Sequence, residues 1–260
     1  MTDLAAAAAH LRSMHVPGDP LMLVNAWDVA SAERAVAAGG RAVGTSSVAM
    51  AASLGLPDDP SAPVRPLFEA LERITNAVDV PVTADLLDGY GLDPAELVDR
   101  LLAAGVVGCN IEDSDHSRPG SLLDPGTVAA RLAAIRSAGV RAGADIVINA
   151  RIDAYLHDGS AATPEVIERA RRYLDAGADC VYPLRLVDPL VVRDLVERLE
   201  APVNANIGGP TTVAGLAAAG VSRISIGPRG FSTALAAFDD LAATLLHAGA
   251  EGGERSLRAR

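Results

Sequence analysis

Two acidic residues and an arginine could together hold a cation and a small carboxylic acid. Asp85, Glu112 and Arg151 each come directly after a run of hydrophobic residues. Carboxylates grouped in an apolar environment repel one another unless a cation lies between them. Mg²⁺ suits such a place because it takes oxygen ligands and keeps several waters, and Mn²⁺ is the alternative. Arginine can hold a carboxylate or phosphonate through two parallel hydrogen bonds.

The elements that must position these residues are eight short hydrophobic runs separated by longer segments of helical periodicity. Runs of this kind are typical of parallel strands that are covered on both faces. The helical segments begin at capping residues such as Asp28, Asp93 and Asp124, and several end in Ala-Gly. The runs are Leu21–Asn25, Ala42–Ser46, Val80–Ala84, Val106–Ile111, Ala144–Ala150, Cys180–Leu184, Val203–Asn206 and Arg223–Ile226.

Eight strand–helix units in 260 residues predict an α/β fold, a (β/α)8 TIM barrel. No Gly-x-Gly-x-x-Gly motif follows the first run, which argues against a dinucleotide-binding fold. We expect one barrel domain over residues 1–250 and a polar tail over 251–260. The active site of such a barrel lies at the carboxyl ends of its strands.

Further polar residues follow the runs and are candidates for the same site. Asp88 comes shortly after Asp85 and is a third candidate metal ligand. Trp27 either lines the mouth or packs at the rim of the barrel. The candidates for substrate binding are Trp27, Thr45, Ser46, Ser47, Arg151 and Asn206, and Asp153 and Tyr155 are expected to brace Arg151.

Composition excludes several other functions. The net charge is −11, aromatic residues make up 3%, and no Arg-rich run is present, so nucleic-acid binding is not expected. No apolar stretch has the length of a membrane span, and no basic segment precedes the alanine run at Ala5–Ala9, so we predict a cytoplasmic protein without a membrane partner. Cys109 and Cys180 lie in apolar runs and are expected to be reduced and buried.

Five short motifs in order along the chain resemble those of the isocitrate lyase/phosphoenolpyruvate mutase superfamily. The resemblance extends from about Asn25 to Gly227-Pro228. It implies an enzyme that depends on Mg²⁺ and cleaves or rearranges a C–C or P–C bond next to the carbonyl of a small α-keto or 2-hydroxy carboxylic acid, through an enolate-like intermediate held on the metal. The motifs are Asn25-Ala26-Trp27-Asp28, Gly55-Leu56-Pro57-Asp58, Ala84-Asp85 with Gly89-Tyr90-Gly91, Asn110-Ile111-Glu112-Asp113 and Ala150-Arg151-Ile152-Asp153-Ala154.

The resemblance also implies roles for individual residues. Asp85 matches the principal metal ligand, Glu112 the acid that holds metal-bound water, and Arg151 the arginine that anchors the substrate. Asp58 matches a catalytic acid on the loop after the second strand. The turn 45–47 matches the place where backbone amides receive the substrate carboxylate.

An assembly is implied as well. Relatives form dimers of dimers by exchanging the last barrel helix, which would be Arg229–Ala248 here, so we expect a homodimer or homotetramer. The apolar face of that helix is equally consistent with packing on its own barrel.

The sequence departs from the family pattern at two places. A second acid is usual two residues after the position of Asp85, but this chain has Leu87, which cannot bind metal, so Asp88 would substitute if the loop shifts. The lyases of the family carry a catalytic cysteine in the loop after the fourth strand. The corresponding segment 114–121 has neither cysteine nor lysine, which argues against a cysteine-dependent isocitrate lyase.

That loop resembles the shorter gate of the mutase, hydrolase and decarboxylase branches. His116, Ser117 and Arg118 could close over a substrate and exclude water, with His116 as a catalytic candidate, or the loop is a solvated surface segment.

Several functions therefore stay open. The first is a carbon–carbon lyase, decarboxylase, phosphonopyruvate hydrolase or phosphonomutase acting on a small carboxylic acid. The second is a catalytically degenerate barrel that binds a small carboxylate or phosphonate without efficient metal catalysis, and Leu87 is the residue that supports it. A third is an unrelated phosphate-binding barrel that uses the glycines of segment 206–210.

Overall fold

The computed structural model describes residues 3–208 and 211–248, and within them the strands are all parallel. Each of the eight predicted runs overlaps a strand, which confirms the α/β prediction. The strands are β1 (Leu21–Leu23), β2 (Asn25–Ala26), β3 (Val43–Thr45), β4 (Val82–Asp85), β5 (Gly108–Glu112), β6 (Val147–Ile152), β7 (Cys180–Pro183), β8 (Asn204–Asn206) and β9 (Arg223–Ser225).

The strands close into a barrel. Strands β2 to β7 pair in sequence order, and β1, β9 and β8 form a second ladder. A parallel bridge between Val181 and Val203 joins β7 to the start of β8. Strands β1 and β2 are one run interrupted at Val24, so the first run pairs with β9 on one side and with β3 on the other. Asn25 secures this closure, because its Oδ1 accepts from the N–H groups of Ile226 and Gly227 at 3.0 Å.

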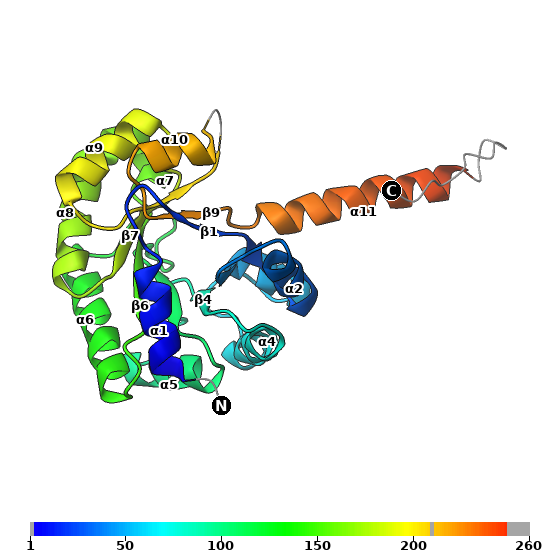
Figure 1. The fold of residues 1–260 in the computed structure, drawn as a ribbon, viewed down its shortest axis with the longest axis horizontal. Helices are drawn as coiled ribbons and strands as arrows, with labels where there is room; N and C mark the ends of the chain where they lie inside the picture. The colour runs from blue at the N-terminus through cyan, green and yellow to red at the C-terminus, as the bar shows by residue number, and fades with distance from the viewer. Residues whose placement is uncertain (1–2, 209–210, 249–260) are drawn as a thin grey trace.

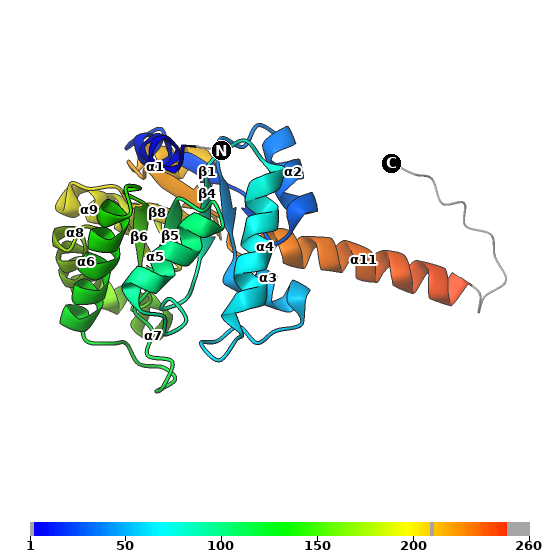
Figure 2. The same cartoon turned by 90° about the horizontal axis from the view of Figure 1, so that it is seen from below.

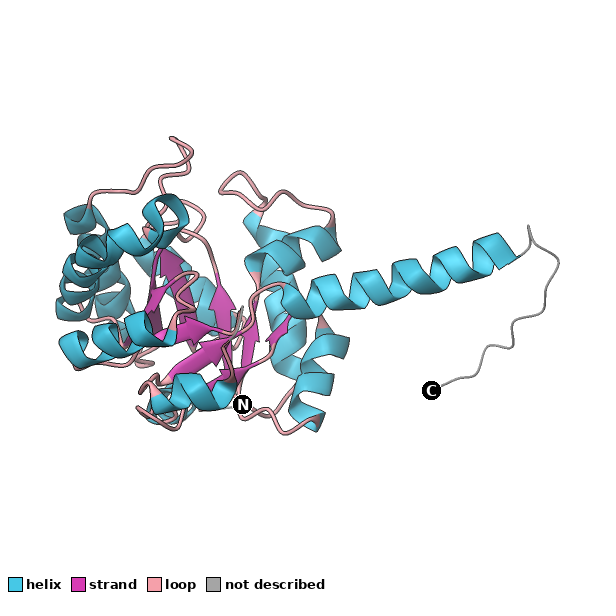
Figure 3. Ribbon diagram, turned by 90° about the horizontal axis from the view of Figure 1, so that it is seen from above, coloured by secondary structure: helices cyan, strands magenta, loops and turns pink. Residues whose placement is uncertain are grey.

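Helices cover the outside of the strands (Figure 3). Helices α2, α5, α6 and α9 are capped by aspartates, whose carboxylates accept backbone N–H groups of the first turn as the sequence predicts. The helices are α1 (Leu4–Ser13), α2 (Val29–Ala37), α3 (Ser47–Leu54), α4 (Val64–Ala77), α5 (Pro94–Ala103), α6 (Pro125–Arg141), α7 (Tyr155–Asp158), α8 (Thr163–Asp175), α9 (Pro189–Leu199), α10 (Val213–Ala218) and α11 (Arg229–Ala248), with a short 3-10 turn at Gly159–Ala162.

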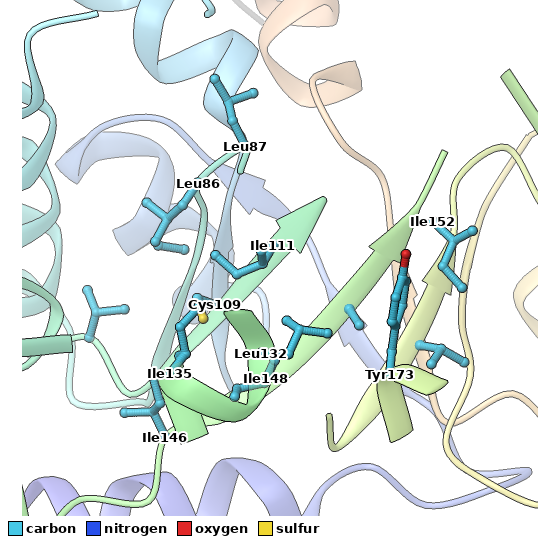
Figure 4. Close-up of a cluster of buried hydrophobic side chains, with 14 of the residues drawn as sticks. Leu86, Leu87, Cys109, Ile111, Leu132, Ile135, Ile146, Ile148, Ile152 and Tyr173 are labelled. Atoms are coloured by element: carbon cyan, nitrogen blue, oxygen red, sulfur yellow. The ribbon is translucent and has the colours of Figure 1, made fainter. Parts of the chain in front are cut away.

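Two apolar layers hold the barrel together. The larger lies between strands and helices, where Cys109, Ile111 and Ile148 meet Leu132 and Ile135 of α6 (Figure 4). The smaller closes the amino end of the barrel. Helix α1 contributes Ala8, Leu11 and Met14 to it, packed against the first residues of the strands. The barrel therefore opens for chemistry only at the carboxyl ends of its strands.

Helix α11 departs from this arrangement and runs away from the barrel (Figures 1 and 2). Its root is held by Phe231, whose ring meets Trp27 edge-on with centroids 5.3 Å apart. Beyond the root, Leu235, Phe238 and Leu245 are 48%, 66% and 50% exposed. The alternative that this face packs on its own barrel is therefore wrong.

Three further expectations concern the whole chain. Among the described residues, no helix is both long enough and apolar enough to span a bilayer; the cytoplasmic location stays a prediction. Residues 251–260 and the domain boundary at 250 lie outside the described residues. Cys109 and Cys180 are free and buried, as predicted, and burial raises the pKa of each thiol to about 12.

Candidate active site at the barrel mouth

Strand register brings the predicted site residues together. Asp85 pairs across β4 and β5 with Asn110, and Asn110 pairs with Asn149 of β6. Two residues further along, Glu112 pairs with Arg151. Because alternate strand residues share a face, the amides and the charged pair form two successive levels inside the barrel.

Arg151 is held between two carboxylates. Its Nε and Nη2 donate to the two oxygens of Asp153 at 2.7 and 2.9 Å, and Nη1 lies 2.6 Å from Glu112 Oε2. The charges of Glu112 and Asp153 raise the pKa of Arg151, although burial opposes them. Asp153 thus braces Arg151 as predicted, whereas the hydroxyl of Tyr155 lies 3.1 Å from Thr163 instead. The two hydrogen bonds to Asp153 use two of the five guanidinium protons, so others stay available to a ligand.

Glu112 lies at the centre of the charged level and is almost fully buried. Burial raises the pKa of Glu112, against the hydrogen bond from His116 and the charge of Arg151. His116 Nε2 is 2.9 Å from Glu112 Oε1, and this contact raises the pKa of His116. His116, on the loop after β5, therefore contacts Glu112 at the mouth, and its catalytic role stays a prediction.

Asp85 is oriented by groups from three neighbouring segments. Its Oδ2 accepts from the backbone N–H and the hydroxyl of Ser47 at 3.3 and 3.2 Å, and its Oδ1 accepts from Asn110 at 3.2 Å. Its own backbone N–H donates to the hydroxyl of Thr45 at 3.2 Å. The backbone N–H of Ser47, which is predicted to receive a substrate carboxylate, therefore donates to Asp85 in this structure. Substrate binding by Thr45 and Ser47 stays a prediction.

Two more acids complete the rim of the mouth. Loss of hydration raises the pKa of Asp58, the neighbouring Ser47 side chain lowers it, and the charge of Asp85 raises it further. Asp88 Oδ1 is buried without a hydrogen-bond partner among the described residues. Burial, and then the charges of Asp85, Asp58, Glu112 and Asp88, raise the pKa of Tyr90 on the loop after β4.

Leu87 lies in a strained turn between Asp85 and Asp88. Its φ is 53°, in the left-handed region that costs a branched L-residue about 1–2 kcal/mol. Its carbonyl accepts the N–H of Glu112 at 2.9 Å, and its side chain belongs to the buried apolar core (Figure 4). The leucine therefore fixes the loop and offers no ligand to the mouth.

The donor set fits a hydrated divalent cation. Among residues 3–208 and 211–248, no three His, Cys, Asp or Glu side chains converge closely enough to bind a metal together. Mg²⁺ does not need three, because it keeps several waters and takes one or two protein carboxylates. The buried Oδ1 of Asp88, close to Asp85 in the chain, lacks a hydrogen-bond donor among the described residues, and it is the kind of acceptor that a metal-bound water satisfies.

The remaining candidates lie at the edge of the mouth. Ser46 is buried as the N-cap of α3, and Trp27 packs on α11. Asn206 contacts the hydroxyl of Tyr182 through both its amide atoms, at 2.7 and 3.0 Å. Their roles in substrate binding stay predictions.

Sequence reasoning missed the buried groups that support the site. Asp113 is fully buried and accepts from Arg169, Tyr173 and the backbone N–H of Asp153. Ser114 donates to Asp153 at 2.6 Å. Asn110, Asn149 and Arg223 lie in hydrophobic runs. The sequence signal for the two asparagines is alternation, because they stand two positions before Glu112 and Arg151.

Comparisons with known proteins agree with this arrangement. The sequence model of the family described as phosphoenolpyruvate phosphomutase matches residues 11–246. An uncharacterized protein of Mycobacterium tuberculosis is 36% identical over 222 residues, covering 85% of this chain and 83% of the relative. The 2-methylisocitrate lyase of Escherichia coli is 29% identical over 215 residues, covering 75% and 71%. The crystal structure of a proposed phosphonomutase from Burkholderia cenocepacia is 39% identical, with a TM-score of 0.87 over 92% of this chain and 99% of that one.

Proposed function

The chain belongs to the phosphoenolpyruvate phosphomutase family, and on that premise we propose that it is an enzyme that uses Mg²⁺ to cleave or rearrange a C–C or P–C bond beside the carbonyl of a small α-keto or 2-hydroxy carboxylic acid. Its relatives by sequence or structure include a lyase and a proposed phosphonomutase, which supports this general class of chemistry.

One observation carries the proposal. Arg151, whose side chain is 15% exposed, pairs with the carboxylates of Glu112 and Asp153 at the mouth, and the charge of Asp85 also acts on it. This arrangement presents an anion-binding group and oxygen ligands for a cation side by side. A small carboxylic acid needs both, one for its carboxylate and one for its carbonyl oxygen.

Each residue at the mouth then has its own role in the proposed reaction. Arg151 anchors the substrate carboxylate through its remaining protons. Asp58, whose pKa is raised, is suited to accept or return a proton at the carbon next to the carbonyl. His116 holds Glu112 and closes the loop over the mouth. Asp85 would bind the cation, and Glu112 and Asp88 would hold its waters.

The cation supplies one contribution. When bound, Mg²⁺ acts as a Lewis acid that stabilises negative charge developing on the carbonyl oxygen of the substrate. Because the loop 114–121 has no cysteine, decarboxylation, hydrolysis or phosphonomutase chemistry fits this site better than cysteine-dependent isocitrate cleavage.

Calorimetric titration with oxalate, a stable mimic of the pyruvate enolate, tests the proposal. We expect oxalate to bind in the presence of Mg²⁺ and not in its absence. Asp85→Ala should weaken binding by more than about tenfold, or about 1.4 kcal/mol. Glu168→Ala, which removes an exposed carboxylate of α8, is the matched control and should bind as the natural protein does. Absence of binding under both conditions would contradict the proposal.

Leu87 supports the second candidate, a barrel that binds a carboxylate without efficient metal catalysis. Its buried side chain cannot contribute the second acid that the family pattern has at this place. Oxalate binding that is unchanged by Mg²⁺ and by Asp85→Ala, but lost in Arg151→Met, would favour this candidate.

A homo-oligomer is part of the proposal. The exposed apolar face of α11 (Leu235, Phe238, Leu241 and Leu245) finds no cover on its own barrel, and a second copy that exchanges this helix would cover it. We expect light scattering to give a dimer or tetramer for the natural protein and a monomer for Phe238→Asp/Leu245→Asp. His247→Asp, on the opposite face of α11, should leave the mass unchanged. A natural protein that is monomeric would refute this part.

A further inference from the structure

The barrel interior holds an arginine that has no carboxylate partner. Arg223 on β9 is 1% exposed, and no ion pair among residues 3–208 and 211–248 includes it. Its Nη2 donates to Asn110 Oδ1 at 3.1 Å, whereas its Nε and Nη1 are buried without a hydrogen-bond partner in the described part of the chain. Burial lowers the pKa of Arg223, yet a guanidinium keeps its proton in proteins.

Such a side chain is costly for the fold. A buried charge that lacks an opposite charge, and buried N–H groups that lack acceptors, both raise the free energy of the folded state. Replacing buried charges by apolar side chains of similar volume is often neutral or stabilising. The arginine therefore calls for an explanation other than stability.

The hydrogen bond from Arg223 Nη2 to Asn110 connects this side chain to the active site. The oxygen of Asn110 accepts from Arg223 and also from Asn149 Nδ2 at 2.8 Å. With its oxygen occupied by two donors, the Asn110 amide must direct its NH₂ group the other way. That group donates to Oδ1 of Asp85 at 3.2 Å.

Arg223 also fixes the direction of this chain of hydrogen bonds. The two amides of Asn149 and Asn110 could each be reversed, because an amide both donates and accepts. A guanidinium only donates, and an ionised carboxylate only accepts. Arg223 at one end and Asp85 at the other therefore set a single polarity for Asn110.

We propose that Arg223 is a positioning residue, which acts through Asn110 to hold the Asp85 carboxylate in the orientation that binds the cation, at the expense of fold stability. The inference rests on the proposed function for the identity of the cation. It predicts an unusual combination, in which removal of the arginine weakens metal binding without weakening the fold.

Titration with Mn²⁺, followed by electron paramagnetic resonance, tests this together with urea unfolding. We expect Arg223→Met to raise the Kd for Mn²⁺ by about 10–100-fold, as is typical for groups that orient metal ligands, while its resistance to urea equals or exceeds that of the natural protein. Arg223→Lys keeps an all-donor cation and should recover part of the affinity. Arg136→Met is the control, because Arg136 bonds Asp145, Asp179 and Gly177 at the closed end of the barrel and has no contact with Asp85.

The outcomes separate this inference from the proposed function. Natural affinity for Mn²⁺ in Arg223→Met overturns the inference, and so does a loss of affinity that Arg136→Met shares. If the natural protein binds no Mn²⁺, the proposed metal chemistry fails, and the anchoring of Asn110 is decided by NMR with ¹⁵N-asparagine, of which the chain has only six. Side-chain amide signals of Asn110 that shift and exchange faster in Arg223→Met support the anchoring, and unchanged signals refute it.

Discussion

Replacing Arg151 by methionine is expected to lower the free energy of unfolding by about 3–5 kcal/mol, the range found when one partner of a buried ion pair is removed. The carboxylates of Glu112 and Asp153 are 3% and 1% exposed and would lose their cation. Urea unfolding measures the change. Arg118→Met removes the same charge from the same mouth, but Arg118 is 73% exposed, so we expect a loss of at most about 1 kcal/mol there.

The deficit of Arg151→Met should depend on pH. Burial already raises the pKa of Glu112, and loss of the nearby arginine raises it further. A carboxyl group whose folded pKa exceeds its unfolded pKa stabilises the fold at low pH, and this contribution is lost as the pH rises through the folded pKa. The deficit should therefore be smaller at pH 5 than at pH 8, and Glu112→Gln in the same chain should reduce it at pH 8. A deficit independent of both pH and Glu112→Gln would contradict the assignment of the buried pair.

The prediction of the fold succeeded because hydrophobic periodicity is local. The runs that form the strands are buried on both faces and mostly apolar, and several helices begin at a capping aspartate such as Asp124. The boundaries were less accurate because hydrogen bonds to neighbours define them. The run Leu21–Asn25 is divided at Val24, which is 44% exposed, where the chain passes from pairing with β9 to pairing with β3.

Sequence reasoning located the polar residues at strand ends and missed those beneath them, and the binding and catalytic roles of the former stay predictions. Asp85, Glu112 and Arg151 follow runs, so the barrel geometry alone brings them to one mouth. The contact between Arg223 and Asn110 joins residues 113 positions apart, and only the register of the closed barrel makes it. Similarly, the apolar face of α11 was readable from spacing, but its exposure depends on the direction in which the helix leaves Trp27 and Phe231.

Replacement of Arg169 is expected to have the second large effect on the free energy of unfolding, at a position away from the proposed ligand. It lies on α8, is 6% exposed, and its Nη1 bonds Asp113, the hydroxyl of Tyr173 and the carbonyl of Leu123 at 2.9–3.2 Å. Asp113 in turn accepts the backbone N–H of Asp153 at 2.9 Å. This single side chain therefore joins α8 to the loop after β5 and to the residue that braces the substrate arginine.

We expect Arg169→Met to cost about 3–5 kcal/mol of unfolding free energy, because Asp113 would remain buried without its cation. Arg172→Met is the control one turn further along the same helix: Arg172 and Glu168 are 52% and 60% exposed, and exposed pairs of this kind contribute about 0.2–1 kcal/mol. Urea unfolding of both variants measures the difference. Oxalate binding should also be measured without urea, where Arg169→Met is fully folded. If binding is weaker there, Asp113 affects Arg151 by orienting Asp153. Equal stability losses in the two variants would show instead that the buried network adds nothing beyond a surface ion pair.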